Sequence, residues 1–217
     1  MLHPDLSNRS AMATLSALFL LSTVVGVLGF PNGPPLAQCP GMIPAGHGPS
    51  NAIGPPPYNI TTSALNYSVG STLDVTISSD NGTIFKGFFL QARRIEPGSD
   101  MNVAIGTFSD IPTGTQTLDC NLIPNSAWGH SNNENKTSIT ANWNAPLQAE
   151  GDIAFRATIV SGVPNLTFYW TDVMSLTVDG PPRATDVPMT TSGVTAVKAS
   201  ALLAVFVSMG AYLTSTF

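Results

Sequence analysis

One stretch of the chain, residues 83–94 (TIFKGFFLQARR), is apolar on both of its alternating faces. Four even-numbered positions are apolar: Ile84, Phe88, Leu90 and Ala92. Three odd-numbered positions are aromatic or lack a side chain: Phe85, Gly87 and Phe89. A strand of this kind is covered on both faces, so the run predicts a strand in the middle of a sheet, with packing above and below. A helix is the alternative for such an apolar run, but Gly87 and the lack of a 3–4 spacing disfavour it.

Two features of this run carry further expectations. Gly87 has no side chain, which predicts that another backbone or an aromatic ring comes close to it. Arg93 and Arg94 end the run and point to opposite faces of a strand. We therefore expect them at a solvated rim, with a heparin-binding patch formed by Lys86, Arg93 and Arg94 as the alternative.

Shorter strand patterns recur from Tyr58 onward, separated by residues that favour turns. Residues 73–78 alternate between apolar and polar side chains, and the sequence 80–82 (DNG) that follows is typical of a turn. Further strand patterns lie at 101–108, 115–121, 137–143, 152–160 and 166–178, the last broken near Asp172. The 19 glycines and 18 prolines fit many short strands joined by turns. About eight or nine strands without a convincing helix predict an all-β fold, an antiparallel β-sandwich.

Residues 31–57 are rich in proline and glycine, which predicts an extended arm lying over the sandwich. The chain has two cysteines, Cys39 in this arm and Cys120 in a predicted strand. An even cysteine count in a secreted chain favours a disulfide, here one that joins the arm to the sandwich. Two buried free thiols are the alternative.

The first residues of the chain predict a signal peptide. Residues 15–28 form an apolar run behind Arg9, and small residues precede Phe30. This pattern is typical of a signal peptide over residues 1–29, with an N-terminal membrane anchor as the alternative.

The last residues predict a glycosylphosphatidylinositol (GPI) anchor. Residues 179–193 are a proposed stalk, and residues 194–217 a hydrophobic signal with no basic residue after its apolar run. Small residues at Ser192 and Gly193, a short spacer and an apolar tail are typical of a GPI signal with attachment at Ser192. A single membrane-spanning helix is the alternative.

Five Asn-x-Ser/Thr sequons follow the predicted signal peptide and predict N-glycosylation. Their asparagines are Asn59, Asn66, Asn81, Asn135 and Asn165. Asn66 is the least secure of them, since Tyr67 has the character of a structural residue.

The chemistry that the sequence offers is sparse. His47 and His130 are the only histidines after the predicted signal peptide, and neither lies in a metal-ligand spacing, so we expect no metal site and no cofactor. No nucleophile motif is present, so we expect no catalytic residues. A net charge of −5 argues against nucleic-acid binding. The candidate contact residues are His47, Arg93, Arg94, Trp128 and His130, although core packing is the alternative for Trp128.

The motif at 87–93 (GFFLQAR) resembles the G-F-x-L-Q-A-R core of the reeler domain, the module at the start of reelin and spondin-type matrix proteins. Other segments agree in the same order, from the CPGMIP sequence at 39–44 to the aromatic pair at 169–170. The resemblance spans about residues 39–178. It implies an Ig-like β-sandwich, with the reeler domain at residues 30–178. Many reeler domains carry a second disulfide in their C-terminal half, whereas this chain has no cysteine after Cys120.

The resemblance also implies three functional contexts: matrix proteins, ferric-chelate reductases, and small secreted defence proteins of invertebrates. From these we expect a non-enzymatic extracellular recognition protein at the cell surface, anchored to the membrane by its C-terminus and acting in innate immune defence. Its ligand would be a glycan, a microbial surface or a matrix protein. A matrix or cell-adhesion module is the alternative. A fragment of a ferric-chelate-reductase-like protein is the more distant one.

Overall fold

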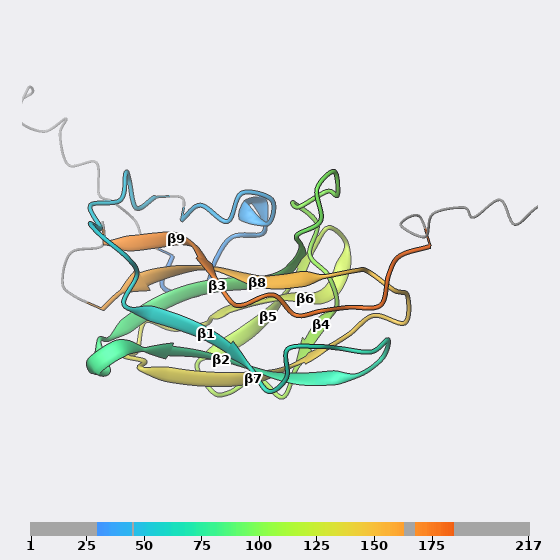
Figure 1. Cartoon of the computed structure of the whole chain (residues 1–217). Helices are drawn as coiled ribbons and strands as arrows, with labels where there is room; N and C mark the ends of the chain where they lie inside the picture. Colours follow the sequence, from blue (N-terminus) through green and yellow to red (C-terminus); the bar gives the residue numbers. More distant parts are fainter. Residues whose placement is uncertain (1–29, 45, 163–167, 185–217) are drawn as a thin grey trace, which may run out of the picture. The chain divides into compact units, whose positions relative to one another are not determined.

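Nine β-strands in two antiparallel sheets make up the part of the chain that the computed structural model describes, residues 30–44, 46–162 and 168–184 (Figure 1). The four-stranded sheet has the order β1-β2-β7-β4. Its strands are β1 (Tyr58–Thr62), β2 (Thr72–Ser79), β7 (Ser138–Asn144) and β4 (Thr107–Ser109). The five-stranded sheet has the order β5-β6-β3-β8-β9. Its strands are β5 (Thr115–Cys120), β6 (Ile123–His130), β3 (Phe85–Arg94), β8 (Ile153–Ser161) and β9 (Tyr169–Met174).

The two sheets face each other in two layers and enclose the main core (Figure 1). Val75 and Ile77 of β2 project into it from one sheet, and Leu90 and Phe155 from the other, all completely buried. Trp143 of β7 meets Phe155 edge-on across the layers, with ring centroids 5.4 Å apart. The predicted all-β sandwich with eight or nine strands is therefore confirmed.

Strand β3 lies in the middle of the five-stranded sheet, as the apolar run at 83–94 predicts. It pairs with β6 at Phe89 and Leu90, and with β8 along nearly its whole length. One face of β3 packs against the opposite sheet. The other contributes Phe89 to a second apolar cluster, which includes Met42 of the N-terminal arm.

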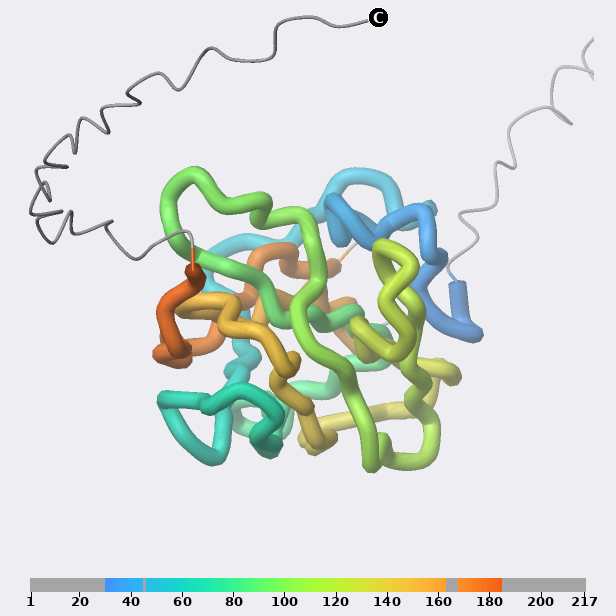
Figure 2. The backbone as a smooth tube through the Cα atoms, turned by 90° about the vertical axis from the view of Figure 1, so that its right-hand side faces the viewer, coloured from blue at the N-terminus to red at the C-terminus, as the bar shows by residue number. Residues whose placement is uncertain are grey.

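The arm, residues 30–57, crosses the outer face of the five-stranded sheet, as predicted (Figures 1 and 2). It contains one turn of 3-10 helix, η1 (Leu36–Gln38), and several hydrogen-bonded turns. Its second half follows β9, where the hydroxyl of Tyr169 donates a hydrogen bond of 2.8 Å to the carbonyl of Gly48. The arm thus acts as a third layer, which explains why a central strand can be apolar on both faces.

The prediction that Phe85 and Gly87 lie on the same face of β3 is wrong, because β3 begins with a β-bulge. Phe85 lies opposite Ser161, whereas Gly87 lies opposite Val160, so Lys86 is the extra residue. The bulge turns Phe85 into the main core, where its ring lies 6.3 Å from that of Phe88. Phe85 therefore does not share a face with Gly87, because a bulge shifts the alternation by one residue.

Two of the predicted strands are shorter than expected, and one strand was missed. Only the last two residues of the predicted strand 101–108 belong to β4, which spans Thr107–Ser109 and is preceded by a single bridge from Ile105 to Ala92. The predicted strand 166–178 reduces to Tyr169–Met174, in which Asp172 has a positive φ of 58°. Strand β6 carries no clean alternation and contains proline and glycine, which concealed it.

The turn predicted at 80–82 is confirmed as a short 3-10 element, η2 (Asp80–Gly82), which carries the chain from β2 in one sheet to β3 in the other. Asn81 has a φ of 51° there, a left-handed conformation that asparagine tolerates better than most residues.

Candidate functional site

The side chains of Gln91 and Arg93, in the sequence motif at 87–93, hold the arm against the five-stranded sheet. The guanidinium of Arg93 donates hydrogen bonds of 2.5 Å to the carbonyl of Cys39 and 2.6 Å to that of Met101. The amide of Gln91 donates to the same Cys39 carbonyl at 3.3 Å. Arg93 therefore joins the arm to the loop after β3, and both segments lie on this side of the sheet in Figures 1 and 2.

Arg93 is 2% exposed, so the expectation of a solvated rim residue is wrong for it. Burial lowers the pKa of Arg93 to about 10, which still leaves the guanidinium charged at neutral pH. Because its side chain is covered by the arm, Arg93 is no surface contact residue and has a structural role.

The predicted disulfide between Cys39 and Cys120 is present and links the arm to the end of β5. A hydrogen bond also attaches the arm to β8: the hydroxyl of Thr158 donates to the carbonyl of Met42. The arm is therefore attached to β3, β5 and β8.

Arg94 points the other way from Arg93 and forms an ion pair with Glu150. Its Nε donates a hydrogen bond of 2.8 Å to a carboxylate oxygen of Glu150. The Arg94 side chain is 14% exposed, so it lies at a rim but is largely engaged within the molecule.

Trp128 is fully buried, which removes it from the candidate contact residues and confirms the core alternative. Its ring packs 4.9 Å from that of Phe88 in the main core. His47 is also largely buried, at 7% exposure, and meets Tyr169 edge-on.

His130 occupies the place where β6 stops pairing with β3. Beyond the paired residues Phe89 and Gly129, the imidazole continues the ladder, because its Nδ1 lies 3.1 Å from the backbone nitrogen of Phe88 and 3.0 Å from the Phe88 carbonyl oxygen. Nε2 lies 3.0 Å from the carbonyl oxygen of Phe30. The neutral tautomer with its proton on Nε2 donates to Phe30 and accepts from the Phe88 N–H. Burial lowers the pKa of His130, which favours this neutral form.

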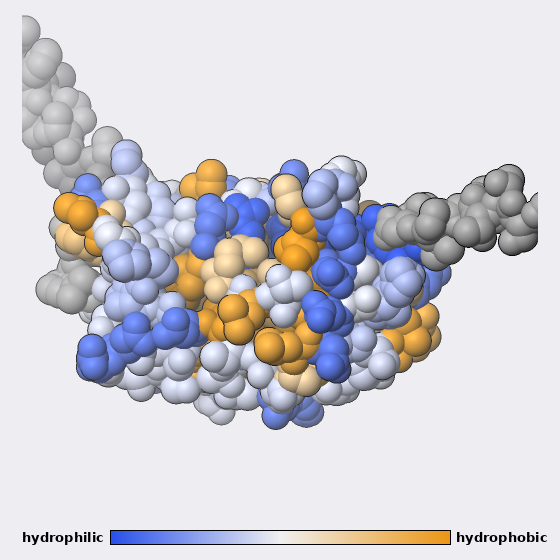
Figure 3. All heavy atoms as spheres, in the orientation of Figure 1, coloured by the Kyte–Doolittle hydropathy of each residue, from blue (hydrophilic) through white to orange (hydrophobic). Residues whose placement is uncertain are grey.

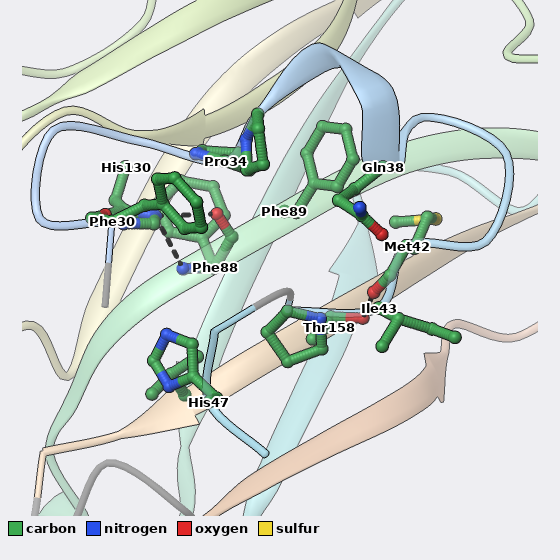
Figure 4. Close-up of a pocket in the computed structure, with 13 residues that line it drawn as sticks. Phe30, Pro34, Gln38, Met42, Ile43, His47, Phe88, Phe89, His130 and Thr158 are labelled. Atoms are coloured by element: carbon green, nitrogen blue, oxygen red, sulfur yellow. Dashed lines mark hydrogen bonds between the residues drawn. The ribbon is translucent and has the colours of Figure 1, made fainter. Parts of the chain in front are cut away.

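Beneath the arm lies a cavity of about 40 Å³, here called the inner chamber. Figure 4 shows Pro34, Gln38, Met42 and Ile43 of the arm around Phe89 and Thr158 of the sheet, with His130 and Phe30 at one end. Its lining is mostly apolar. Gly129 permits this arrangement, because a Cβ there would stand 2.8 Å from the ring of Pro34.

Beside the inner chamber lies a larger hollow of about 260 Å³, here called the outer cleft. Both are lined by Phe30, His47, His130 and Val160. The outer cleft is also lined by Pro31, Lys86, Gly87, Asn133 and Ser161. A Cβ on Gly87 would lie 3.3 Å from both the His130 ring and Val160, which agrees with the ring that we expected near this glycine. No aspartate or glutamate lines either hollow. The outer cleft therefore offers a positive charge from Lys86 and hydrogen-bond donors such as the amide of Asn133.

Four of the five sequon asparagines are exposed, namely Asn59, Asn66, Asn81 and Asn135. Asn59 and Asn81 lie at one end of the sandwich, where the side-chain amide of Asn59 donates a hydrogen bond of 2.7 Å to the carboxylate of Asp80. Asn165 lies outside the described residues, as do the predicted signal peptide, Ser192 and the hydrophobic C-terminal segment.

A different side of the molecule shows apolar residues gathered between β1 and β9 (Figure 3). Four exposed apolar residues follow or end these strands in the chain: Leu65, Val69, Met174 and Leu176. The two strands are edges of their sheets and meet through Tyr58 and Trp170, with ring centroids 5.5 Å apart. This apolar side is separate from the outer cleft.

Within the described ranges, no group of three or more histidine, cysteine, aspartate or glutamate side chains could hold a metal ion. None of the helices in this part of the chain is long and apolar enough to cross a membrane.

A model of the reeler domain family matches residues 37–185. Ferric-chelate reductase 1 of Homo sapiens is 35% identical over 188 residues, covering 82% of this chain but 30% of the reductase. A Bombyx mori protein named as a defense protein is 34% identical over 148 residues, covering 66% of this chain and 81% of that protein. The chain thus spans less than a third of the reductases and most of the defense protein.

A solved structure, the Reelin-N domain of F-spondin, aligns with 63% of this chain and 94% of its own chain. The TM-score is 0.48 and the sequence identity 22%.

Proposed function

The chain belongs to the reeler domain family, and from this premise we propose that it is a non-enzymatic extracellular recognition protein that acts at the cell surface in innate immune defence. Its contact surface would be the outer cleft and the arm segments beside it. The sandwich would hold this surface rigid, as scaffolds commonly do for binding loops.

The observation that carries the proposal is the outer cleft. It combines apolar walls with Lys86, His47 and His130, and its lining contains no carboxylate. Such a mixture of apolar surface and few polar groups is typical of a binding site. The lining holds one hydroxyl, that of Ser161, and two histidines but no carboxylate, so the residues that line the cleft do not supply a Ser–His–Asp/Glu triad.

Relatives named as defense proteins support the biological context. The match covers 81% of the Bombyx mori protein and 91% of a Samia ricini protein with a related name. In the reductases the match covers only 27–30% of the length, so the reductase activity belongs to much longer proteins.

The test is a microbial-surface and glycan array, probed with the glycosylated protein purified from cells that express the full chain. We expect binding to a subset of microbial surfaces. Lys86→Gln should weaken this binding, while Arg183→Gln, which removes the same charge outside the cleft lining, should not. Binding to matrix proteins alone would instead support the adhesion alternative.

The second candidate is a recognition module of a reductase-like protein, favoured by 33–35% identity to ferric-chelate reductases. It is tested by ferric-reducing turnover and a haem absorption band in the purified full chain. Either signal would overturn the non-enzymatic proposal.

The membrane attachment at Ser192 and the glycosylation of the five sequons are also part of this proposal. They are supported by the sequence patterns at 194–217 and at the sequons. Treating expressing cells with a phosphatidylinositol-specific phospholipase should release the protein. Retention would favour a membrane-spanning helix instead.

A further inference from the structure

We propose that the outer cleft binds a small monocarboxylate with an apolar body, such as a medium-chain fatty acid. This inference deepens the proposed function, on which it rests, by assigning a ligand class to the same site. It is carried by the origin of the cleft, its charge and its size.

The cleft exists because two irregularities coincide in the five-stranded sheet. The β-bulge leaves Lys86 without a partner on β8, and Gly87 beside it has no side chain. On the other flank, the imidazole of His130 replaces the ladder between β6 and β3. Bulges often re-aim a side chain next to a functional site, and here Lys86 borders the hollow.

The charge of the cleft favours an anion. Among the described residues, the ion pairs are Arg94–Glu150 and Arg156–Asp172, so the ammonium of Lys86 has no carboxylate partner there. No acidic residue lines the cleft, while Asn133 and Ser161 add polar groups to it. An anionic head group near Lys86 would therefore gain a Coulomb attraction without displacing an existing partner.

The apolar part of the lining favours a ligand whose body, apart from the anionic head group, is apolar. Phe30 and Pro31 of the arm and Val160 of β8 face the cleft, and the inner chamber that adjoins it is lined by further apolar residues, among them Phe89. The cleft volume of about 260 Å³ leaves room for a short apolar chain with one head group.

The N-terminal end of the described chain adds a second positive group under the proposed processing. Removal of residues 1–29 would make Phe30 the first residue, and its carbonyl is already fixed by His130 at 3.0 Å and by the backbone N–H of Gly33 at 3.2 Å. The new α-ammonium would then belong to a residue that lines the cleft.

The test is calorimetric titration of sodium octanoate into the protein purified from cells that express the full chain. We expect saturable binding that weakens with added salt, as an ion pair does. Octylamine and 1-octanol lack the anion, so they should bind at least about fivefold more weakly, the factor that corresponds to roughly 1 kcal/mol for a partly exposed ion pair. Acetate keeps the anion but lacks the apolar chain, so it should bind more weakly still. Equal binding of octanoate and octylamine overturns the inference.

Two variants locate the site. Lys86→Gln should weaken octanoate binding about fivefold and leave 1-octanol unchanged, whereas Arg183→Gln should change neither. Gly87→Leu should abolish binding by filling the cleft, and its far-ultraviolet circular dichroism should match the parent's. If Gly87→Leu does not fold, nuclear magnetic resonance of the parent decides: octanoate must shift the ring signals of His130 or His47, and binding that shifts neither ring overturns the site.

The outcomes also separate this inference from the proposed function. Array binding without carboxylate binding overturns the cleft assignment and leaves surface recognition standing. Carboxylate binding without any array signal supports the cleft assignment and removes the recognition function.

Discussion

Replacing Arg93 with methionine tests whether the buried guanidinium holds the arm on the sandwich. Methionine keeps an unbranched apolar stem and removes the two short hydrogen bonds to Cys39 and Met101. Hydrogen bonds from a charged group contribute about 1.5–3 kcal/mol each, so two of them give about 3–6 kcal/mol. The lower end applies, because Cys39 keeps its bond from Gln91 and Met101 is exposed to water. We expect Arg93→Met to lower the free energy of unfolding by about 3 kcal/mol.

The adjacent Arg94 provides a matched control. Arg94→Met removes the same charge and keeps the same apolar stem at the next position on β3, but the partner it loses is Glu150, with the two side chains 14% and 17% exposed. We expect a smaller loss of about 1.5 kcal/mol for this variant, the low end for a hydrogen bond to a charged group. Urea denaturation followed by tryptophan fluorescence measures both losses, since Trp128 and Trp143 are buried and report on the core.

Arm release gives an independent reading. Limited proteolysis should cleave Arg93→Met within residues 36–44 faster than either the parent or Arg94→Met. Equal destabilisation by the two substitutions, or an Arg93→Met loss within about 0.5 kcal/mol of zero, would refute the anchoring role.

Cys120→Ser should lower the free energy of unfolding by up to about 4.5 kcal/mol, because the 81-residue separation closes a long loop, and non-reducing peptide mapping of the parent should recover Cys39 linked to Cys120. Trp128→Ala should cost about 3–5 kcal/mol in thermal unfolding, and a loss below 1 kcal/mol would contradict its place in the core. Burial lowers the pKa of His130 below its ordinary 6.5, so as the pH falls the imidazole is protonated first in the unfolded chain. The contribution of His130 to the free energy of unfolding should therefore be complete above pH 6.5 and be lost as the pH falls through the folded pKa. In His130→Gln the free energy of unfolding should fall less steeply over this range.

The hydrophobicity of the chain was sufficient to predict most of the strands and the sandwich class. The apolar run at 83–94 is visible because β3 is buried on both faces, and β2 and β8 show equally regular patterns. Strand β6 was missed because its pattern is interrupted by Pro124 and Gly129. Gly129 leaves room for the ring of Pro34, a contact that one strand pattern cannot reveal. The bulge at Lys86 was equally hidden, since it depends on how β3 registers with β8.

The candidate site could be predicted only in part. His47 and His130 were singled out as rare residue types, and the structure places both at the outer cleft. Lys86 was set aside with the two arginines, because its position on a bulge cannot be read from one strand alone. Arg93 and Trp128 failed as surface residues for the same reason: the arm and the opposite sheet bury them, and a strand pattern does not say what covers it.

The arm also has a consequence for the behaviour of the chain outside its oxidised native state. Phe89, Leu118 and Ala127 form an apolar cluster that is closed off by Cys39 and Met42. Reduction of the disulfide between Cys39 and Cys120 leaves this part of the arm held by non-covalent contacts alone, and its departure would expose a contiguous apolar surface to water. The reduced chain should therefore self-associate more readily than the oxidised chain.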